Sequence, residues 1–358
     1  MEFLDSITTQ LERKIHKFNA IQYSHERIRY FDKKKEAFIK NNNIPELPDS
    51  VAQQIKNFWG KYVKYDFGLN YHRIAALNNP IESLPYIVSD SVLYPLLINK
   101  LNPENYYRVL ANKGLYNTIF SDVRRPNEII RNVNGNYLDS NNDLLTEDAA
   151  IDKILSLNSP FIIKKSTYTY GGLGVKVIKE YEKALIKQHF EHFKKDFVVQ
   201  ELLQQSQQTA RFNPTSLNTF RILTLLLNGK LTVLGAWMRC GAKGALVDNL
   251  TSGGMAACIL SNGRFSFATN LSIPKIEYSP TGLKFEDCRI EHFDRIIEKA
   301  IQLHKRIPVI VMAGWDFALD VNDEPVFIEA NLRHPDTWPW QMTQGPIFGD
   351  RLQEVLDY

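Results

Sequence analysis

The residues best suited to chemistry lie between positions 311 and 332, in the segment VMAGWDFALDVNDEPVFIEANL. One apolar run carries Asp316, a polar turn follows, and a second apolar run carries Glu329 and Asn331. This pattern predicts a β-hairpin in which Glu329 and Asn331 share a face and Asp316 lies opposite them. Two carboxylates and an amide offer hard oxygen ligands, which suit Mg²⁺, with Mn²⁺ as an alternative ion. A hairpin with a solvated polar face is the alternative interpretation.

A second segment has the composition of a phosphate-binding loop. Residues 159–178, SPFIIKKSTYTYGGLGVKVI, predict a strand that ends in Lys164 and Lys165, a flexible loop and a second strand. Glycines let backbone N–H groups approach a polyanion closely, and a lysine supplies a point charge for phosphate. The loop glycines are Gly171, Gly172 and Gly174. The loop matches neither the Walker A nor the Rossmann pattern. A plain hairpin with a glycine turn is the alternative.

A third segment, FVVQELLQ at residues 197–204, predicts a strand that ends at Glu201 and runs into a linker. A carboxylate and backbone groups exposed at such a strand end can hydrogen-bond the edge of an adenine ring. The alternative is a strand end with one exposed glutamate.

In this order the three segments resemble the ATP-grasp superfamily, over about residues 105–345. Asp316 and Glu329 are 13 residues apart, with Asn331 two further on, as in the D-alanine–D-alanine ligase branch. The resemblance extends to the sugar-transfer-associated ATP-grasp proteins, through SLNTFRILTLL (216–226), LGAWMRCG (234–241), VDNLTSGG (247–254), GWDFAL (314–319) and FIEANLRHPD (327–336). It implies an α/β (α+β) fold in which two α+β subdomains clasp ATP.

The resemblance also implies a role for each matching position. Lys113 and either Lys164 or Lys165 match lysines that bind the phosphates of ATP, and Glu201 matches the carboxylate at the adenine. The remaining matches are basic positions near the transferring phosphate, Arg221 and Arg239, and the metal ligands Asp316, Glu329 and Asn331. A structural ion pair is the alternative for each arginine, because a buried guanidinium needs a partner. Gln208 stands where many relatives carry an acidic residue for the ribose hydroxyls.

Two further groups are candidates for the acceptor side of the site. Backbone N–H groups at Gly253 and Gly254 could hold a carboxylate or the γ-phosphate as an anion nest, with a plain turn as the alternative. A cluster of charged and aromatic residues suits a sugar or peptide-like substrate, because aromatic faces stack on apolar ring faces. Its members are Arg333, His334, Asp336, Trp338, Trp340 and Gln341. Packing of the two tryptophans into the core is the alternative.

These parts suit phosphoryl transfer from ATP to a carboxylate, followed by displacement of phosphate by an amine. The protein must mainly neutralise transferring charge and hold the reactants in line. The sequence and its resemblance therefore predict an amide-forming ligase that releases ADP and phosphate, with a role in cell-surface polysaccharide biosynthesis. An ATP-grasp phosphotransferase and a noncatalytic nucleotide-binding protein are the two alternatives.

Composition limits the partners. The 358 residues carry 43 basic and 40 acidic side chains, a net charge of +3, which does not favour nucleic-acid binding by the whole protein. Three scattered cysteines argue against a disulfide framework and favour a reducing compartment. No run of eighteen apolar residues or secretory signal is evident, so we expect a cytoplasmic protein that acts on small molecules.

The order of the elements predicts three regions. Residues 1–83 form a helical N-terminal extension, in which apolar residues from Leu4 to Phe38 recur at spacings of three and four. Residues 84–150 form a reduced α/β region ahead of the ATP-grasp domain. Residues 151–358 form that domain, with a lid of about 151–203, a larger part of about 204–358, and an amphipathic helix over 289–306. Residues 1–64 hold 12 basic and 8 acidic side chains, and peripheral contact with an acidic membrane surface is a weaker alternative role for them.

Overall fold

The computed structural model describes residues 32–64, 67–167 and 174–358. The part of the predicted N-terminal helix before residue 32 lies outside these ranges, as do Gly171 and Gly172. The chain folds into two compact units. Unit 1 comprises Met1–Pro103, Leu271–Pro274 and Thr337–Tyr358, and unit 2 comprises Glu104–Asn270 and Lys275–Asp336.

Unit 1 is helical in its described part. Residues 32–41 form a helix. The other elements are α2 (Asp49–Trp59), α3 (Asn70–Ala75), η1 (Ile81–Tyr86), α4 (Asp90–Val92), η2 (Leu93–Ile98), α5 (Asn99–Leu101), α12 (Trp338–Thr343), η6 (Gly349–Arg351) and α13 (Leu352–Asp357). Helix α2 lies within the predicted helical extension and buries Val51, Ile55 and Trp59 along one face.

Two residues expected near the acceptor lie in the core of unit 1. Trp338 is buried and packs edge-on against Phe38 and Tyr71, with ring centroids 5.8 and 5.3 Å apart. Gln341 is fully buried and donates from Nε2 to the Val88 carbonyl at 2.8 Å, while its Oε1 accepts from the Val88 N–H at 2.8 Å. Core packing, the alternative interpretation, is therefore the one observed for Trp338. The side-chain amide of Gln341 is likewise used inside the protein, where its hydrogen bonds to Val88 tether α12.

One stretch of the described residues, Ile81–Leu101, passes a length and hydropathy test for crossing a membrane. It is divided among η1, α4, η2 and α5, and 61% of its most apolar window is buried inside the protein. Because a buried core helix passes the same test, this is weak evidence for a span.

The first sheet of unit 2 is antiparallel and has the strand order β3–β2–β1–β6–β4–β5. The strands are β1 (Glu128–Val133), β2 (Asn136–Asp139), β3 (Leu144–Leu145), β4 (Phe161–Lys165), β5 (Val175–Ile178) and β6 (Phe197–Glu201). The strands predicted around residues 161–163, 175–178 and 197–201 are confirmed. The first three strands come from the segment predicted as a reduced preceding region, yet they share this sheet.

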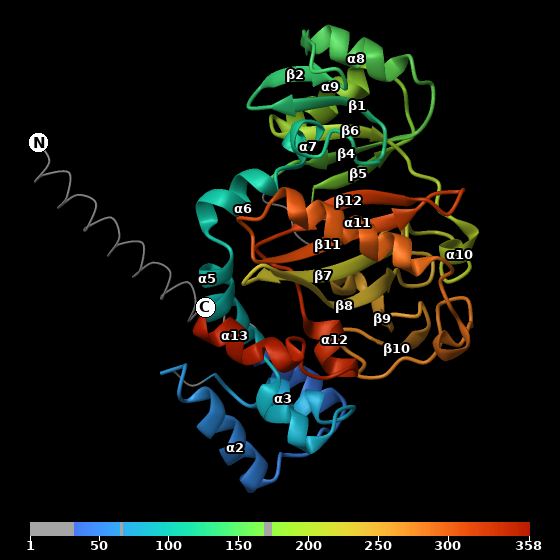
Figure 1. Ribbon diagram of the computed structural model, residues 1–358. Helices are drawn as coiled ribbons and strands as arrows, with labels where there is room; N and C mark the ends of the chain where they lie inside the picture. Colours follow the sequence, from blue (N-terminus) through green and yellow to red (C-terminus); the bar gives the residue numbers. More distant parts are fainter. Residues whose placement is uncertain (1–31, 65–66, 168–173) are drawn as a thin grey trace, which may run out of the picture. The chain divides into compact units, whose positions relative to one another are not determined.

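The two faces of the first sheet have different surroundings. Helices α8 (Glu147–Leu155) and α9 (Lys183–Phe193) cover one face (Figure 1), where Ile163 and Val199 join a buried cluster with residues of both helices. In the pairing of β4 with β6, Lys164 lies opposite Val198, and Ile162 lies opposite Gln200. Because side chains alternate along a strand, these four residues point to the other face.

The second sheet of unit 2 has the strand order β10–β9–β8–β7–β11–β12 and is also antiparallel. Its strands are β7 (Thr219–Leu227), β8 (Lys230–Cys240), β9 (Met255–Ile259), β10 (Phe265–Thr269), β11 (Met312–Leu319) and β12 (Pro325–Asn331). The hairpin predicted over 311–332 is confirmed by β11 and β12, and Asp316 lies opposite Glu329 in their register. Short elements accompany this sheet, namely α10 (Gln207–Ala210), η4 (Leu250–Ser252) and η5 (Phe285–Asp287).

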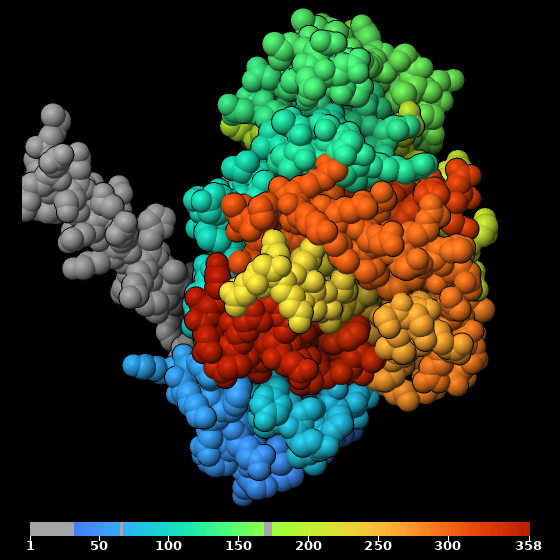
Figure 2. Space-filling view, viewed as in Figure 1, coloured from blue at the N-terminus to red at the C-terminus, as the bar shows by residue number. Residues whose placement is uncertain are grey.

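Helix α11 (Phe293–Arg306) covers one face of the second sheet and confirms the predicted amphipathic helix (Figure 1). Asp294 in its first turn and basic residues in its last turn complement the helix dipole. Its outer side, coloured orange, lies on the surface in Figure 2. On its inner side, buried His304 contacts Thr224 Oγ1 at 2.7 Å and the Ile310 carbonyl at 2.8 Å. Burial lowers the pKa of His304 to about 4, so the imidazole is neutral and structural.

The segment with α6 (Glu104–Leu110), η3 (Lys113–Leu115) and α7 (Tyr116–Ile119) is bonded to both sheets of unit 2. The Lys113 N–H donates to the Ser166 carbonyl, just after β4, at 3.0 Å. The Tyr116 hydroxyl accepts from the Ala330 N–H of β12 at 2.9 Å. Lys113 is therefore held between the strand that carries Lys164 and the strand that carries Glu329.

The β12 strand depends on an aromatic cluster for its position. Phe327 is 1% exposed and contacts the rings of Tyr116, Phe120, Trp315 and Phe317. We predict that Phe327→Ala lowers the free energy of unfolding by about 3–5 kcal/mol, through lost burial and the cavity left behind. Urea unfolding followed by tryptophan fluorescence measures this change.

Val321→Ala is the matched control, because Val321 sits in the turn of the same hairpin and is 60% exposed. We expect its free energy of unfolding to stay within about 0.5 kcal/mol of the wild type. Equal losses in the two variants would show that the cluster does not anchor the hairpin.

Candidate active site

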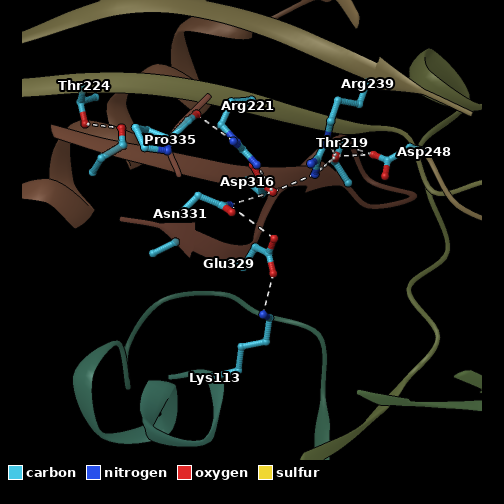
Figure 3. A network of polar contacts seen from close by, with 12 residues as sticks. Lys113, Thr219, Arg221, Thr224, Arg239, Asp248, Asp316, Glu329, Asn331 and Pro335 are labelled. Atoms are coloured by element: carbon cyan, nitrogen blue, oxygen red, sulfur yellow. Dashed lines mark hydrogen bonds and ion pairs between the residues drawn. The ribbon is translucent and has the colours of Figure 1, made fainter. Parts of the chain in front are cut away.

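A network of charged and polar side chains lies on the strands of the second sheet (Figure 3). Its origin is the strand register, in which Asp316 of β11 lies opposite Arg221 of β7 on one side and Glu329 of β12 on the other. In the next pairing, Thr219 of β7 lies opposite Arg239 of β8. Four neighbouring strands therefore bring these side chains together, although up to 110 residues separate them in the chain.

Asp316 is the most buried charge of the network, with 0% of its side chain exposed. Arg221 donates two hydrogen bonds to it, from Nε to Oδ1 and from Nη2 to Oδ2, the second at 3.0 Å. The third nitrogen, Nη1, donates to the Pro335 carbonyl at 2.8 Å. A buried carboxylate is tolerated only when it is paired and hydrogen-bonded, and this bidentate pair meets that need. Each guanidinium nitrogen of Arg221 is thus used within the protein, as the structural alternative supposed.

Gly314 makes room for this arrangement. A Cβ atom added there would lie 3.0 Å from Arg221 Cδ and 3.0 Å from the Pro335 carbonyl oxygen. Either neighbour would have to move for a larger residue to fit, and both hold Asp316 through Arg221. The glycine in the GWDFAL segment therefore has a packing role.

Arg239 binds the same carboxylate from the other side. Its Nη2 donates to Asp316 Oδ2 at 2.7 Å, and Nη2 and Nε donate to Thr219 Oγ1 at 2.7 and 3.0 Å. The Thr219 hydroxyl donates in turn to Asp248 Oδ2. Burial lowers the pKa of Arg239, but Asp248, Asp316 and Glu329 outweigh it and hold the pKa above its usual range. Nη1 makes no hydrogen bond or ion pair with residues 32–64, 67–167 and 174–358, so Arg239 retains a donor for a ligand.

Thr219 and Asp248 are members of the network that the sequence reasoning did not single out for chemistry. Both lie in segments that carry the family resemblance, SLNTFRILTLL and VDNLTSGG. Burial raises the pKa of the Asp248 carboxyl more than the charge of Arg239 lowers it. Their membership of these two segments was the available signal, because the burial of Asp248 and its contact with Arg239 depend on the fold.

Glu329 completes the network on β12. Lys113 Nζ lies 2.7 Å from Glu329 Oε2, and Asn331 Nδ2 lies 3.2 Å from Asp316 Oδ2 and 3.4 Å from Glu329 Oε1. Burial raises the pKa of Glu329, but Lys113, Arg239 and Arg221 outweigh it, so the pKa lies well below its usual range. The three predicted metal ligands therefore converge, and Glu329 is ionised at neutral pH.

The two candidate lysines of β4 have different surroundings. Lys165 Nζ donates to the carbonyls of Phe193 and Lys195, the latter at 2.7 Å. Lys164 is only 8% exposed and has no hydrogen-bond or ion-pair partner among residues 32–64, 67–167 and 174–358. Burial and then the charge of Lys113 lower the pKa of Lys164 to about 8. A buried, unpaired ammonium is suited to an incoming anion, which favours Lys164 over Lys165.

Glu201 and its neighbour Gln200 lie on opposite faces of the first sheet. Glu201 lies opposite Phe161 and accepts from Asn127 Nδ2 at 3.0 Å. Gln200 lies on the face of Lys164, is 7% exposed, and its buried Oε1 has no partner in the described part of the chain. A buried amide oxygen without a partner can accept from a ligand N–H. The alternation of β6 was the signal that the side chain of residue 200, and not that of 201, faces the lysine.

The glycines predicted to bind anions have structural roles where they are described. The N–H groups of Gly253 and Gly254 donate to the carbonyls of Leu250 and Asn249, at 3.3 and 3.0 Å, so the turn uses both of them. In this conformation the anion nest is therefore not available, and the plain-turn alternative is observed. Gly174 has a φ of +75° and its carbonyl accepts from the Lys165 N–H at 2.9 Å, which closes the β4–β5 hairpin.

The sequence matches the family described as Sugar-transfer associated ATP-grasp over residues 95–357, nearly three quarters of the chain. The chain belongs to this family. The fold agrees with the expected α+β ATP-grasp class, with two antiparallel sheets and helices on their faces. A comparison with curated proteins found no match.

Several solved structures show distant likeness to this ATP-grasp protein. D-alanyl-alanine synthetase A from Vibrio cholerae is 13% identical, with 71% of this chain and 66% of that chain covered and a TM-score of 0.42. N5-carboxyaminoimidazole synthetase from Staphylococcus aureus, complexed with ADP, is 16% identical, with 63% and 46% covered and a TM-score of 0.40. An ADP complex of N5-carboxyaminoimidazole ribonucleotide synthetase is 12% identical, with 63% and 45% covered and a TM-score of 0.38. This chain thus spans less than two thirds of the length of each of these three proteins.

The donor set of this ATP-grasp protein fits a hard divalent cation. The three side chains meet at Asn331, whose Nδ2 lies 3.2 Å from Asp316 Oδ2 and 3.4 Å from Glu329 Oε1, so a rotation of the amide would turn its oxygen toward the two carboxylates. Mg²⁺ takes few protein oxygens and keeps phosphate oxygens and water in its other positions, so Asp316, Glu329 and Asn331 suffice in kind and number. No cluster of three or more His, Cys, Asp and Glu side chains suited to a metal occurs among the described residues, so this mixed set is the candidate.

Gly314→Ala tests the packing behind Asp316. We predict a loss of about 1–3 kcal/mol in the free energy of unfolding, because the new methyl group must displace Arg221 or the Pro335 backbone. Ala313→Gly is the comparison variant, because it makes the opposite change in size one residue away on the same strand. Thermal and urea unfolding measure both, and a neutral Gly314→Ala would contradict the packing role.

Lys164 gives a pH-dependent prediction. Its folded pKa of about 8 lies below its usual value of 10.5, so the unfolded chain binds more protons between these pH values and stability rises with pH there. Below pH 8 the buried charge lowers the free energy of unfolding, and Lys164→Met removes this charge. We therefore expect this variant to be more stable than the wild type at pH 7, by about 1–3 kcal/mol, and to approach it by pH 10.

Urea unfolding at pH 7, 8.5 and 10 measures this effect. Lys176→Met is the matched control, because Lys176 lies on the neighbouring strand β5 with an exposed side chain. We expect it to keep the pH dependence of the wild type. A Lys164→Met curve parallel to the wild type would show that the ammonium is not desolvated.

Proposed function

We propose that this protein is an ATP-dependent carboxylate–amine ligase that acts through an acyl phosphate. The observation that carries the proposal is the convergence of Asp316, Glu329 and Asn331 beside the cations Lys113 and Arg239. Phosphoryl transfer needs positive charge and a metal around the moving phosphate far more than it needs a protein nucleophile. The network offers such charge on strands that fix its geometry.

Each group then has a physical task. A carboxylate oxygen of the acceptor attacks the γ-phosphorus of ATP, the bond from that phosphorus to the bridging oxygen breaks, and ADP leaves. An amine nitrogen attacks the acyl carbon, phosphate leaves, and the nitrogen loses a proton. Lys164 and Lys113 neutralise the phosphates, and Arg239 orients the transferring group through its remaining donor. Mg²⁺, held by the three oxygen ligands, would add charge stabilisation at the phosphates.

The nucleotide is proposed to lie on the face of the first sheet that carries Lys164. Ile162 and Val198 supply apolar surface on this face, and Gln200 Oε1 supplies a buried acceptor for the exocyclic amine of adenine. Backbone groups at Glu201 stay candidates for the ring edge, although its side chain points to the other face. We further propose that residues 151–203 act as a lid over the nucleotide and that residues 204–358 carry the metal.

The family description favours an acceptor related to sugar transfer. We therefore propose that the ligase modifies a sugar or an amino acid in cell-surface polysaccharide biosynthesis, and that it works in the cytoplasm, where ATP is available. Small molecules are its proposed partners. Acceptors with a carboxylate and an amine are the compounds to test first.

Product analysis tests this function directly. The protein is incubated with ATP, Mg²⁺, nucleotide sugars and amino acids, and ADP, phosphate and acceptor adducts are measured by mass spectrometry. A ligase releases ADP and free phosphate and forms an amide only when both acceptors are present. A stable phosphorylated acceptor that forms without an amine would favour the phosphotransferase instead.

Glu329→Gln tests the metal assignment in the same assay. The substitution keeps the size of the side chain and removes its charge, so we predict a loss of at least about a hundredfold in ATP turnover. Glu324→Gln is the matched control, because Glu324 lies in the turn of the same hairpin and pairs with Arg295 outside the network. Equal turnover by Glu329→Gln and the wild type would refute the assignment.

A further inference from the structure

One carboxylate oxygen of Glu329, Oε2, is already bonded to a cation of the protein. Lys113 Nζ lies 2.7 Å from Glu329 Oε2, with the two side chains 13% and 26% exposed. An ammonium and a divalent metal ion use the same carboxylate lone pairs. A metal that binds Oε2 therefore competes with Lys113, and one that binds Oε1 meets the repulsion of the neighbouring ammonium.

The charges of the network also oppose a metal that arrives alone. Its ionisable groups comprise three carboxylates and three cations, so their formal charges cancel; they are Asp248, Asp316, Glu329, Lys113, Arg221 and Arg239. A bare divalent cation would bring two uncompensated positive charges into a site where Asp316 is fully buried. Buried charge without a partner is strongly unfavourable. A triphosphate, with about four negative charges, reverses that imbalance.

Lys113 is placed to change partners. Its backbone is fixed by the hydrogen bond from its N–H to the Ser166 carbonyl at 3.0 Å, so only the side chain has to move. Ser166 follows the strand that carries Lys164, and the charge of Lys113 is close enough to depress the pKa of Lys164. Anionic groups bound near Lys164 would attract Lys113 away from Glu329.

We propose that Lys113 is a placeholder cation on Glu329, and that phosphate groups of the nucleotide release it so that a divalent metal can take its place. Metal and nucleotide then bind with positive coupling, and the site discriminates against free metal. This inference rests on the metal and nucleotide positions of the proposed function.

Titration with Mn²⁺ in the absence of nucleotide tests the placeholder without any turnover. The loss of the electron paramagnetic resonance signal of free Mn²⁺ measures binding to the full-length protein. For Lys113→Met we expect affinity at least about tenfold above the wild type, within the range of coupling between sites in proteins. Lys113→Arg retains the positive charge, and we expect it to bind Mn²⁺ as weakly as the wild type. Far-ultraviolet circular dichroism confirms that each variant is folded.

Two further variants separate the possible failures. Lys164→Met removes a nearby charge that does not contact Glu329, and we expect its effect to be less than about a third of that of Lys113→Met. Equal gains from the two variants, or no gain from Lys113→Met, would overturn the placeholder. Lys113→Met combined with Glu329→Gln should lose the gained affinity. If it does not, the Mn²⁺ lies elsewhere, and the metal position of the proposed function fails with the inference.

Discussion

The carboxylate of Asp316 is buried completely, and the site depends on the cations that compensate it. Arg221 and Arg239 approach it from β7 and β8, and both bond its Oδ2. Loss of one partner from a buried ion pair costs about 3–5 kcal/mol, which is a large part of the stability of a typical domain. The residues around Asp316 must therefore, before anything else, supply positive charge to its carboxylate.

Other residues position the partners of the Asp316 carboxylate. Gly314 leaves space for Arg221, and the Thr219 hydroxyl links Arg239 to Asp248. Lys113 and Asn331 connect Glu329 to the same set. The result is a network whose formal charges cancel, and its strands hold Asp316 and the two arginines in fixed register, which suits phosphoryl transfer because stabilisation comes from charges that are already in place.

Local patterns predicted much of this arrangement. Alternation and a polar turn predicted the hairpin with Asp316 opposite Glu329, and the spacing of apolar residues predicted α11. The ion pairs of Asp316 could not be read in the same way, because they depend on the register of strands that are distant in the chain. The pairing of Lys113 with Glu329 joins residues more than 200 positions apart, and no local pattern encodes it. At Glu201 the strand end was predicted, but Gln200 on the face of Lys164 was not singled out, because the burial of each face of β6 is set by neighbours distant in the chain.

We propose that Asp316, Glu329 and Asn331 share one divalent cation beneath a triphosphate. Crystals grown with Mn²⁺ and a nonhydrolysable ATP analogue test it most directly, because manganese gives an anomalous signal that locates the ion independently of the protein. We expect one anomalous peak at about 2.0–2.3 Å from oxygens of these side chains and beside phosphate oxygens, with Lys113 moved from Glu329 to the phosphates. A peak elsewhere, with Asp316 and Glu329 still bonded only to arginine and lysine, would contradict it.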